Sequence, residues 1–383
     1  MQKYIIKNGD REMISAVKRF INNEIVLCVA FVLAVISSFF VPPDKSYFAY
    51  IDFRTLSILL ALMITMAGLQ RLSVFRQIGE LLVSKMSSIR GVALVLLGLC
   101  FFSSMFITND VALLTFVPFS IVTLSISGRK DLFIRVIVLE TIAANLGSML
   151  TPLGNPQNLY LYSLAGMSLG EFIKLMLPYS LLSLVMILAC GIFFVKKAPM
   201  TLSEKNVYDR SKKDKLMIAM YLFTFLVSIL VVAHMLDYRI GLIIVLVLVL
   251  AFDRRVLRTP DYCLLLTFIF LFIFIGNIKR IPELSSVIGQ LLSVNEVVVS
   301  IILSQFISNV PAAILCSGFT DNVSNLIVGT NLGGLGTLIA SMASLISFKQ
   351  YGYIDGADKK KYIGVFTVMN LVFLGVMLVF HLV

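Results

Sequence analysis

The stretches NLGSMLTPLGNP, residues 145–156, and NLGGLGTLIASM, residues 331–342, are two versions of one phrase. Each begins with Asn-Leu-Gly, reaches a threonine after three further residues, and lies inside a long uncharged segment. Proline removes a backbone donor and clashes with the preceding helical turn, and a glycine costs about 1 kcal/mol in a helix interior. Each phrase therefore predicts a break in an otherwise apolar helix.

The segments around the two phrases are typical of a membrane protein. Of the 383 residues, 59% are hydrophobic and 14% are charged, whereas about a quarter of a soluble domain is charged. Most of the uncharged runs are long enough, or nearly so, to cross a hydrocarbon core of about 30 Å as helices, which satisfy their own backbone groups in lipid. These runs are 25–43, 55–70, 91–109, 111–128, 141–170, 175–195, 216–236, 240–252, 262–278, 297–320, 322–348 and 363–383. The sequence predicts an all-α polytopic membrane protein.

The remaining composition argues against other classes. The net charge of +11 lies in loops between apolar runs, where it sets orientation, so we expect no nucleic-acid partner. The five cysteines lie in apolar runs without paired spacing and are expected to be small buried hydrophobes, not a disulfide framework or a metal site. No cleavable signal peptide is expected, because the first apolar run follows 24 polar-rich residues and no small-residue cleavage site comes after it.

The basic loops predict the orientation in the cell inner membrane. The positive-inside rule places the N-terminus, residues 1–23, in the cytoplasm together with the basic stretches 71–90, 129–135, 196–215, 254–258 and 349–361. This requires 91–128 and 297–320 each to return to the side from which it enters, and it places the C-terminus outside. Two full crossings in place of each re-entrant hairpin would preserve the charge pattern, so re-entry needs separate support.

That support is an internal repeat. FITNDVALL, residues 106–114, matches FISNVPAAIL, residues 306–315, at a distance of 200 residues, and the Asn-Leu-Gly phrases lie 186 residues apart. AGLQRL at 67–72 also resembles IGNIKRI at 275–281. Five crossings separate the starts of the two halves, so the second half is predicted to be inverted, as in many secondary transporters.

The repeat predicts the domain organisation. A first inverted repeat covers 24–196, with a re-entrant hairpin at 91–128 and a broken helix at 136–163. A cytoplasmic loop and linking helix cover 197–238. The second repeat covers 239–383, with a hairpin at 296–321 and a broken helix at 325–348.

The broken helices carry the first candidate site residues. Unwound backbone at membrane depth is tolerated against protein or a watery cavity, where it offers carbonyl oxygens to cations and helix N-termini to anions. The alternative is plain small-residue helix packing. The candidates for cation or proton coupling in the breaks are Gly147, Thr151, Gly154, Gly333 and Gly336, and those for substrate binding are Asn155, Asn158 and Thr337.

The hairpin tips carry the second set. Thr108, Asn109, Ser308 and Asn309 are polar residues between apolar arms and are candidates for substrate binding. Asp110 follows the first tip, where the second tip has a valine, so the predicted site is not symmetric. A carboxylate within a membrane segment is a functional candidate by default. Asp110 is expected to bind Na⁺ together with Asn109, to carry a coupling proton or to contact the substrate; the alternative is a helix cap.

Glu140 is the other carboxylate of this region. It stands at the start of the first broken helix, close to Arg135 in the sequence. We expect it at the cytoplasmic edge, in a solvated ion pair with Arg135.

In these residues the chain resembles the ion transporter superfamily, which includes arsenite permeases, NhaD-type sodium/proton antiporters, citrate transporters and divalent anion/sodium symporters. The resemblance covers about residues 24–380 and rests on ITND (107–110), TPLGNPQN (151–158), ISNVP (307–311) and NLGGLGTLI (331–339). In the symporters each tip reads Ser-Asn-Thr and holds carboxylate and sodium, whereas both tips here lack the last threonine. The resemblance implies a homodimer, and a transport domain of hairpins and broken helices that moves as an elevator.

The expected function is secondary transport of a small anion, a carboxylate such as citrate or a dicarboxylate or an inorganic oxyanion, coupled to Na⁺ or H⁺. The alternative is an arsenite efflux permease or a Na⁺/H⁺ antiporter that uses Asp110. A channel is less compatible with inverted broken helices. An integral-membrane enzyme is not expected, because no nucleophile, metal cluster or Asp-rich diphosphate motif lies at a membrane face. The expected partners are the small anion, the coupling cation and the lipid bilayer, and no cofactor is expected besides Na⁺.

Overall fold

The chain is built from helices, as the sequence predicts. A computed structural model describes residues 24–199 and 210–382. Apart from one isolated β-bridge, all the secondary structure of these described residues is helical. The predicted cytoplasmic N-terminus, 1–23, lies outside these residues. Eight described helices are long and apolar enough to cross a membrane: α4 (Phe53–Arg71), α6 (Ile89–Ile107), α7 (Asn109–Ile126), the run Lys130–Leu150 that contains α8 (Phe133–Gly147), α10 (Leu169–Phe194), α11 (Lys212–Val232), α13 (Tyr262–Lys279) and α19 (Lys359–Leu382). The prediction of an all-α polytopic membrane protein is confirmed.

The shorter helices connect these elements or form broken ones. Two are apolar, α2 (Ile25–Phe40) and α12 (Tyr238–Phe252), and α14 (Pro282–Val294) meets α15 (Glu296–Ile307) at a bend of 114°. The others are α3 (Ser46–Tyr50), α5 (Val74–Val83), α9 (Pro156–Ala165), α16 (Asn309–Ser317), α17 (Val323–Leu332) and α18 (Met342–Gly352), with the 3₁₀ turns η1 (Lys130–Leu132), η2 (Ser148–Leu150), η3 (Arg254–Arg258) and η4 (Leu338–Ala340).

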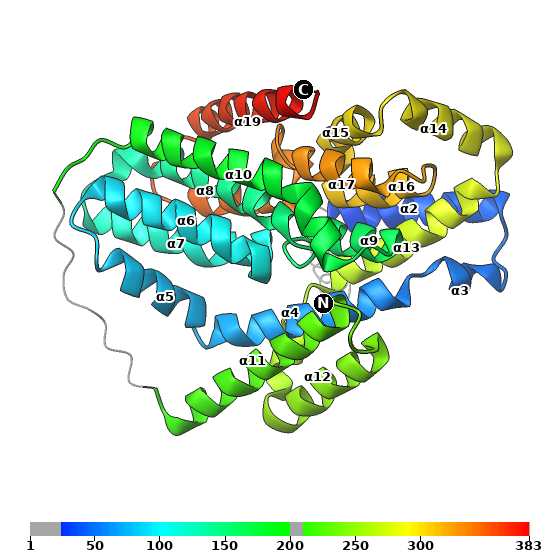
Figure 1. Ribbon diagram of the computed structural model, residues 1–383, viewed down its shortest axis with the longest axis horizontal. Coiled ribbons are helices and arrows are strands. Elements are labelled where there is room, and N and C mark those ends of the chain that lie inside the picture. Colours follow the sequence, from blue (N-terminus) through cyan, green and yellow to red (C-terminus); the bar gives the residue numbers. More distant parts are fainter. Residues whose placement is uncertain (1–23, 200–209, 383) are drawn as a thin grey trace, which may run out of the picture. The chain divides into compact units, whose positions relative to one another are not determined.

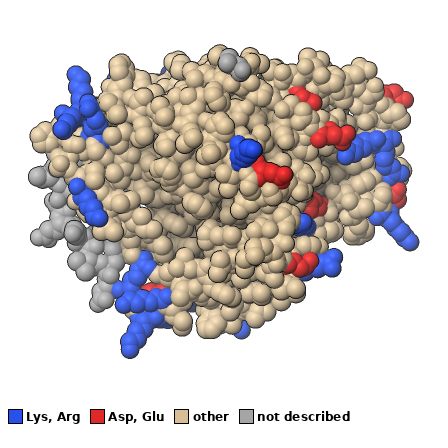
Figure 2. All heavy atoms as spheres, viewed as in Figure 1, with Lys and Arg blue, Asp and Glu red and all other residues tan. Residues whose placement is uncertain are grey.

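The surface carries the apolar side chains expected of contact with lipid. On α10, Val185 and Phe193 are 65% and 81% exposed, while Ser183 and Gly191 of the same helix are buried. Uncharged residues make up most of the face in Figure 2, and lysine and arginine occur there in small groups. An apolar surface of this extent is unfavourable in water and is typical of a membrane-embedded protein.

The chain divides into two compact units that do not follow its linear order. The smaller unit combines the chain up to Asp52 with Asp261–Ile288, and the larger one combines Phe53–Pro260 with Gly289–Val383. Each unit thus joins segments of both predicted repeats.

The helix pairing inside the units is reciprocal. In the smaller unit, α2 of the first predicted repeat packs on α13 of the second; in the larger unit, α12 of the second packs on α4 of the first. The ends of the paired helices are joined by equivalent ion pairs, Arg280 with Asp44 at 2.8 Å and Arg71 with Asp253 at 2.9 Å. Such an exchange is the pattern that two equivalent halves produce, although the inverted repeat itself stays a prediction.

The weak similarity between AGLQRL and IGNIKRI has a packing reason. A Cβ at Gly68 would lie 2.1 Å from the ring of Tyr221, and a Cβ at Gly276 would lie 2.3 Å from the ring of Tyr50. Each glycine therefore leaves room for a tyrosine within its own unit. The Tyr221 hydroxyl donates to Asp253 at 2.8 Å, so the ring and the ion pair form one polar cluster at the end of α4.

The larger unit holds both hairpins and both broken helices. In Figure 1, α6, α7, α8 and α10 lie side by side, and α6 and α8 each contact the other three helices. α6 and α7 form a helical hairpin. α15 and α16 form a second one, which packs on α17. α6 and α7 have 19 and 18 residues, so each is long enough for a full crossing, and re-entry of this hairpin stays a prediction.

Thiol labelling tests the predicted topology. In a variant without the native cysteines, cysteines placed at Ser88 and Ser127 are expected to react with a membrane-impermeant reagent from the cytoplasmic side. Labelling of the two positions from opposite faces would contradict the inverted-repeat arrangement. A third cysteine at Phe106, which is 49% exposed beside the tip, separates the two remaining alternatives: labelling from outside would show two full crossings in place of a re-entrant hairpin.

Candidate functional site

The two hairpin tips share an unusual backbone conformation. Thr108 between α6 and α7 has φ 69° and ψ 150°, and Ser308 between α15 and α16 has φ 72° and ψ 154°. Positive φ at a residue other than glycine costs of order 1–3 kcal/mol and persists where the surrounding structure enforces it. The tips therefore stop one helix and start the next in the same way, with Asn109 and Asn309 as the first residues of the second arms.

The two Asn-Leu-Gly phrases are helix breaks, as predicted. α8 ends at Gly147 and α9 begins at Pro156, where the side chain of Asn155 caps the new helix by accepting from the Asn158 amide at 2.9 Å. α17 ends at Leu332 and α18 begins at Met342. Each break thus offers the start of a new helix.

The asparagines of the two breaks reach across to each other. Asn331 of the second break contacts Asn155 and Asn158 of the first: Asn155 Nδ2 donates to Asn331 Oδ1 at 3.1 Å, and Asn331 Nδ2 donates to Asn158 Oδ1 at 2.6 Å. Asn145 of the first break contacts Ser341 and Ser344 of the second: Ser341 Oγ donates to Asn145 Oδ1 at 3.0 Å, and Asn145 Nδ2 lies 3.4 Å from Ser344 Oγ.

The residues joined by these contacts lie at equivalent positions of the two repeated phrases. Asn145 and Asn331 are 186 residues apart, as are the positions of Asn155 and Ser341 and those of Asn158 and Ser344. We call these six residues the crossed polar cluster. All six side chains are buried, and the first break supplies amides where the second supplies hydroxyls.

The hairpin tips extend the crossed polar cluster. Asn109 Nδ2 donates to Asn145 Oδ1 at 3.0 Å, and the Asn109 backbone amide donates to the carbonyl of Gly154 at 3.1 Å. On the other side Asn145 Nδ2 lies 3.5 Å from the carbonyl of Gly334, and a Cβ at Gly334 would lie 3.0 Å from Asn309 Nδ2. Both tip asparagines therefore border the cluster.

The two predicted threonines fasten the breaks to the hairpins. The Thr151 hydroxyl donates to the carbonyl of Met105, and the Thr337 hydroxyl donates to the carbonyl of Gln305 at 3.1 Å. Met105 and Gln305 occupy equivalent positions, three residues before their tips. The amide of Gln305 also donates to the carbonyls of Gly333 and Leu335 at 3.1 and 2.9 Å. In this conformation Thr337 bonds to the hairpin of its own half, and among the described residues it makes no hydrogen bond to the crossed polar cluster.

The predicted glycines allow close backbone approach. A Cβ at Gly147 would lie 2.1 Å from the carbonyl oxygen of Phe101, one at Gly154 would lie 1.9 Å from that of Ser148, and one at Gly333 would lie 2.5 Å from Ser304 Oγ. Gly336 has φ 110°, which strains any other residue. Close packing and backbone conformation thus explain why glycine stands at these positions. The part of these glycines in ion coupling stays a prediction.

The electrostatics of the cluster favour an anion. The N-termini of α7, α9 and α18 lie at the cluster and that of α16 lies beside Gly334, and a helix N-terminus carries partial positive charge. The bonded neighbours are amides, hydroxyls and carbonyls. Asp110 is half-buried in the first turn of α7, and its backbone amide donates to Asn109 Oδ1 at 3.0 Å. A carboxyl group thus stands beside the tip, and its part in ion coupling stays a prediction.

The expectation for Glu140 was wrong. Its side chain is 0% exposed within α8, whereas Arg135 is exposed, and Glu140 forms no ion pair in the described part of the chain. The hydroxyl of Ser120 on α7 donates to its Oε1. The sequence placed Glu140 near the membrane edge by its distance from the basic loop, but packing of α6, α7 and α19 around α8 removes it from water.

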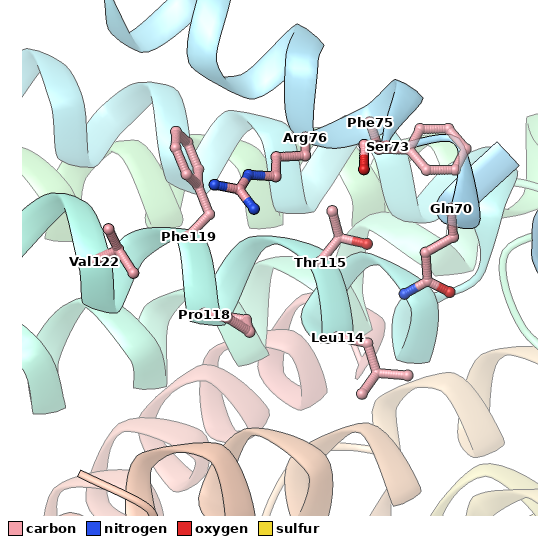
Figure 3. A pocket seen from close by; sticks show the side chains of 9 residues that line it. All are labelled: Gln70, Ser73, Phe75, Arg76, Leu114, Thr115, Pro118, Phe119 and Val122. Carbon is pink, nitrogen blue, oxygen red and sulfur yellow. The ribbon is translucent and has the colours of Figure 1, made fainter. Parts of the chain in front are cut away.

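A cavity of about 250 Å³ lies apart from these residues. Figure 3 shows it between the end of α4, the start of α5 and the middle of α7, with Arg76, Gln70 and Thr115 among the polar lining residues. Arg76 is paired with Glu80 at 2.9 Å, which offsets its charge, and none of the tip or break asparagines lines the cavity. We place the candidate site at the crossed polar cluster, because that is where buried polar groups of both halves meet.

The site contains residues that were not predicted as ligands. Asn145 and Asn331 open the repeated phrases yet were not among the predicted site residues, and Gln305 carried no signal at all. The first two could have been found, because an asparagine repeated inside an apolar run needs hydrogen-bond partners. Gln305 could not, since the equivalent residue is Met105.

Comparisons with known proteins point to transport. A family model described as citrate transporter matches residues 13–324. The inner membrane protein YbiR of Escherichia coli is 32% identical over 321 residues, covering 82% of this chain and 84% of the relative. The uncharacterized transporter MJ0456 of Methanocaldococcus jannaschii is 34% identical over 304 residues, covering 79% of this chain and 82% of the relative.

Proposed function

Because the chain belongs to the citrate transporter family, we propose that it is a secondary active transporter of small anions, coupled to Na⁺ or H⁺. The proposed substrates are carboxylates, such as citrate or a dicarboxylate, and inorganic oxyanions. The membership makes the chain a multi-pass membrane protein of a transporter family; the substrate, the coupling ion and the direction belong to the proposal.

The crossed polar cluster is the observation that carries the proposal. A carboxylate or oxyanion presents several acceptor oxygens, and the cluster presents amide and hydroxyl donors together with the N-termini of α7, α9 and α18. In this conformation the donors bond to one another. An arriving anion can replace an amide oxygen as the acceptor. Binding then exchanges one set of hydrogen bonds for another, and no buried donor is left without a partner.

The geometry also suggests how binding couples to movement. The side-chain-to-side-chain hydrogen bonds of the crossed polar cluster join one break to the other, and Asn109 and Asn309 lie against the first and the second break. An anion that takes these donors loosens the contact between the halves. We propose that this supports alternating access, with hairpins and breaks moving as an elevator domain within a homodimer.

Transport measurements test the proposal directly. Purified protein in proteoliposomes is expected to take up a labelled anion from a panel of citrate, succinate and phosphate, when either a Na⁺ or a pH gradient is imposed. Uptake of none of the anions under either gradient, together with sodium-driven proton movement, would favour the antiporter alternative instead.

Replacing Asp110 by asparagine tests the coupling. Two unit charges about 4 Å apart repel by about 4 kcal/mol at an effective dielectric of 20, so a carboxylate beside an anion site needs a cation or a proton. Asp110→Asn keeps the size but removes the charge. The variant is expected to retain substrate binding and to lose the dependence of uptake on Na⁺ or on the pH gradient.

Asp237→Asn is the matched control for a helix-capping role. Asp237 caps α12 by accepting from the Arg239 amide at 2.8 Å, far from the hairpin tips in the sequence. Asparagine caps about as well as aspartate, so this variant should transport normally. If Asp110→Asn behaves like Asp237→Asn, Asp110 serves the helix and not the coupling ion.

A further inference from the structure

Glu140 is a carboxyl group that the proposed substrate site does not use. It lies on α8, five residues before Asn145, and 0% of its side chain is exposed. The Ser120 hydroxyl donates to Oε1, and Oε2 has no hydrogen-bond partner among the described residues. Thus one carboxyl oxygen is satisfied and the other is not.

The fold does not require a carboxyl group at this position. Leu326 stands five residues before Asn331 in the second half, at the place equivalent to Glu140, and it is also 0% exposed. A leucine therefore satisfies the same packing in the partner half. Glu140, like Asp110 opposite Val310, is a departure from the symmetry of the two halves.

Glu140 has no ion-pair partner among the residues that the structure describes. The titratable side chains that face Glu140 from neighbouring helices are Cys100 of α6 and Tyr362 of α19, with Tyr351 of α18 stacked on Tyr362 at 4.9 Å between ring centroids. Among the charged side chains of α8 and of the helices packed on it, those exposed are Lys130, Asp131, Arg135, Glu171, Lys174, Lys349, Lys359, Lys360 and Lys361. Those half-buried are Arg90, Asp110, Arg129 and His381. Of these, Arg90 donates to the carbonyl of Val195 at 2.7 Å, Arg129 pairs with Asp131 at 2.9 Å, and His381 bonds to the Tyr179 hydroxyl at 2.8 Å.

The neutral form of Glu140 suits this environment. An isolated buried carboxylate carries a very large desolvation cost, and such groups take up a proton instead. A neutral carboxyl group with one unsatisfied atom costs far less than a buried charge.

Hydroxyl groups mark a route from Glu140 toward the end of α7. Ser120, Thr123 and Ser127 follow at spacings of three and four residues, which places them on one face of the helix. Ser120 and Thr123 are buried and Ser127 is half-buried. Since Ser120 bonds to Glu140, this face is turned toward α8, and the row leads to the last turn of α7.

We propose that Glu140 is a buried protonation site, which holds a proton in this conformation and exchanges it through the Ser120–Ser127 face of α7 during the transport cycle. The exchange is a plain acid–base step: the O–H bond of the carboxyl group breaks and the proton passes to water at the end of α7. In the alternative transport state the carboxylate takes a proton from water on the other side of the membrane, and hydroxide is left there. This deepens the proposed function, on which it rests, by naming H⁺ as a coupling ion and Glu140 as its carrier.

Infrared spectroscopy of the purified protein tests the protonation without any substrate. The carbonyl stretch of a protonated carboxyl group is distinct from the bands of a carboxylate. At pH 7 this band is expected in the wild type, absent in Glu140→Gln, and retained in Glu171→Gln, which changes an exposed capping carboxylate of α10. A protonated-carboxyl band that Glu140→Gln leaves unchanged would show that Glu140 is ionised and would overturn the proposal.

Uptake in proteoliposomes tests the exchange. With the membrane potential clamped at zero, a gradient of one pH unit can drive about tenfold accumulation for one coupled proton. Glu140→Gln and Glu140→Leu, which copies Leu326, are expected to lose this accumulation but to keep the counterflow exchange of labelled for unlabelled anion; Glu171→Gln keeps both. Accumulation that persists in Glu140→Gln overturns the proposal even if the infrared band is lost. Absence of anion uptake in the wild type contradicts the proposed function, while the infrared result still reports on Glu140.

Discussion

Alanine at Asn109 or at Asn309 is expected to abolish anion transport while most of the folded protein remains. Asn109 joins a hairpin tip to the crossed polar cluster through Asn145, and Asn309 lies against Gly334 on the other side. Each asparagine supplies both a donor and an acceptor. Asn145 keeps the bond from Ser341 when Asn109 is removed, so the fold loses about 1–3 kcal/mol, whereas the anion loses its ligand.

The matched control for these variants is Asn370→Ala. Asn370 is 0% exposed and its amide donates within α19 to the carbonyl of Phe366 at 2.9 Å, with no bond to the cluster. Thermal unfolding should show a similar loss of stability in all three variants. Uptake of the transported anion should persist in Asn370→Ala alone. Near-normal uptake in both tip variants would mean that the hairpin tips are not the binding site.

Alanine at Gly154 is expected to have the largest effect on folding. The new methyl group would lie 1.9 Å from the Ser148 carbonyl oxygen, and alanine at Gly147 would lie 2.1 Å from that of Phe101. Backbone atoms cannot move aside as a flexible side chain can, so the helix break must open. Overpacking in a core typically costs 1–3 kcal/mol, and we expect about 3 kcal/mol or more here.

Gly98→Ala on α6 is the control, and we expect it to keep or raise the stability of the fold. No atom lies within 4 Å of a Cβ placed there, and alanine is favoured over glycine inside a helix by roughly 0.5–1 kcal/mol. The yield of monodisperse protein and its melting temperature should fall for Gly154→Ala and Gly147→Ala and should hold or rise for Gly98→Ala. Equal stability of Gly98→Ala and Gly154→Ala would contradict the close approach at the first break.

The local features of this protein could be predicted from its sequence. Hydropathy determines that α4, α10 and α19 are helices in a membrane, because lipid leaves the backbone no other partners. Gly147, Pro152 and Gly154 disfavour a continuous helix through the first break, and Pro156 fits the first turn of α9, because glycine and proline act through their own covalent structure. The tips at Asn109 and Asn309 were predicted for the same kind of reason, as polar groups between apolar arms.

The contacts between distant segments were decided only by the tertiary structure. The repeated phrases indicated that Asn145 and Asn331 are equivalent, but not that each reaches into the opposite break, to Ser341 and to Asn158. That pairing depends on which helices of one half pack against helices of the other half, as α12 packs on α4. Glu140 shows the same limit most clearly: five residues from a basic loop it was expected in water, and the helices that close over α8 bury it, because burial depends on what packs against a residue and not on its sequence neighbours.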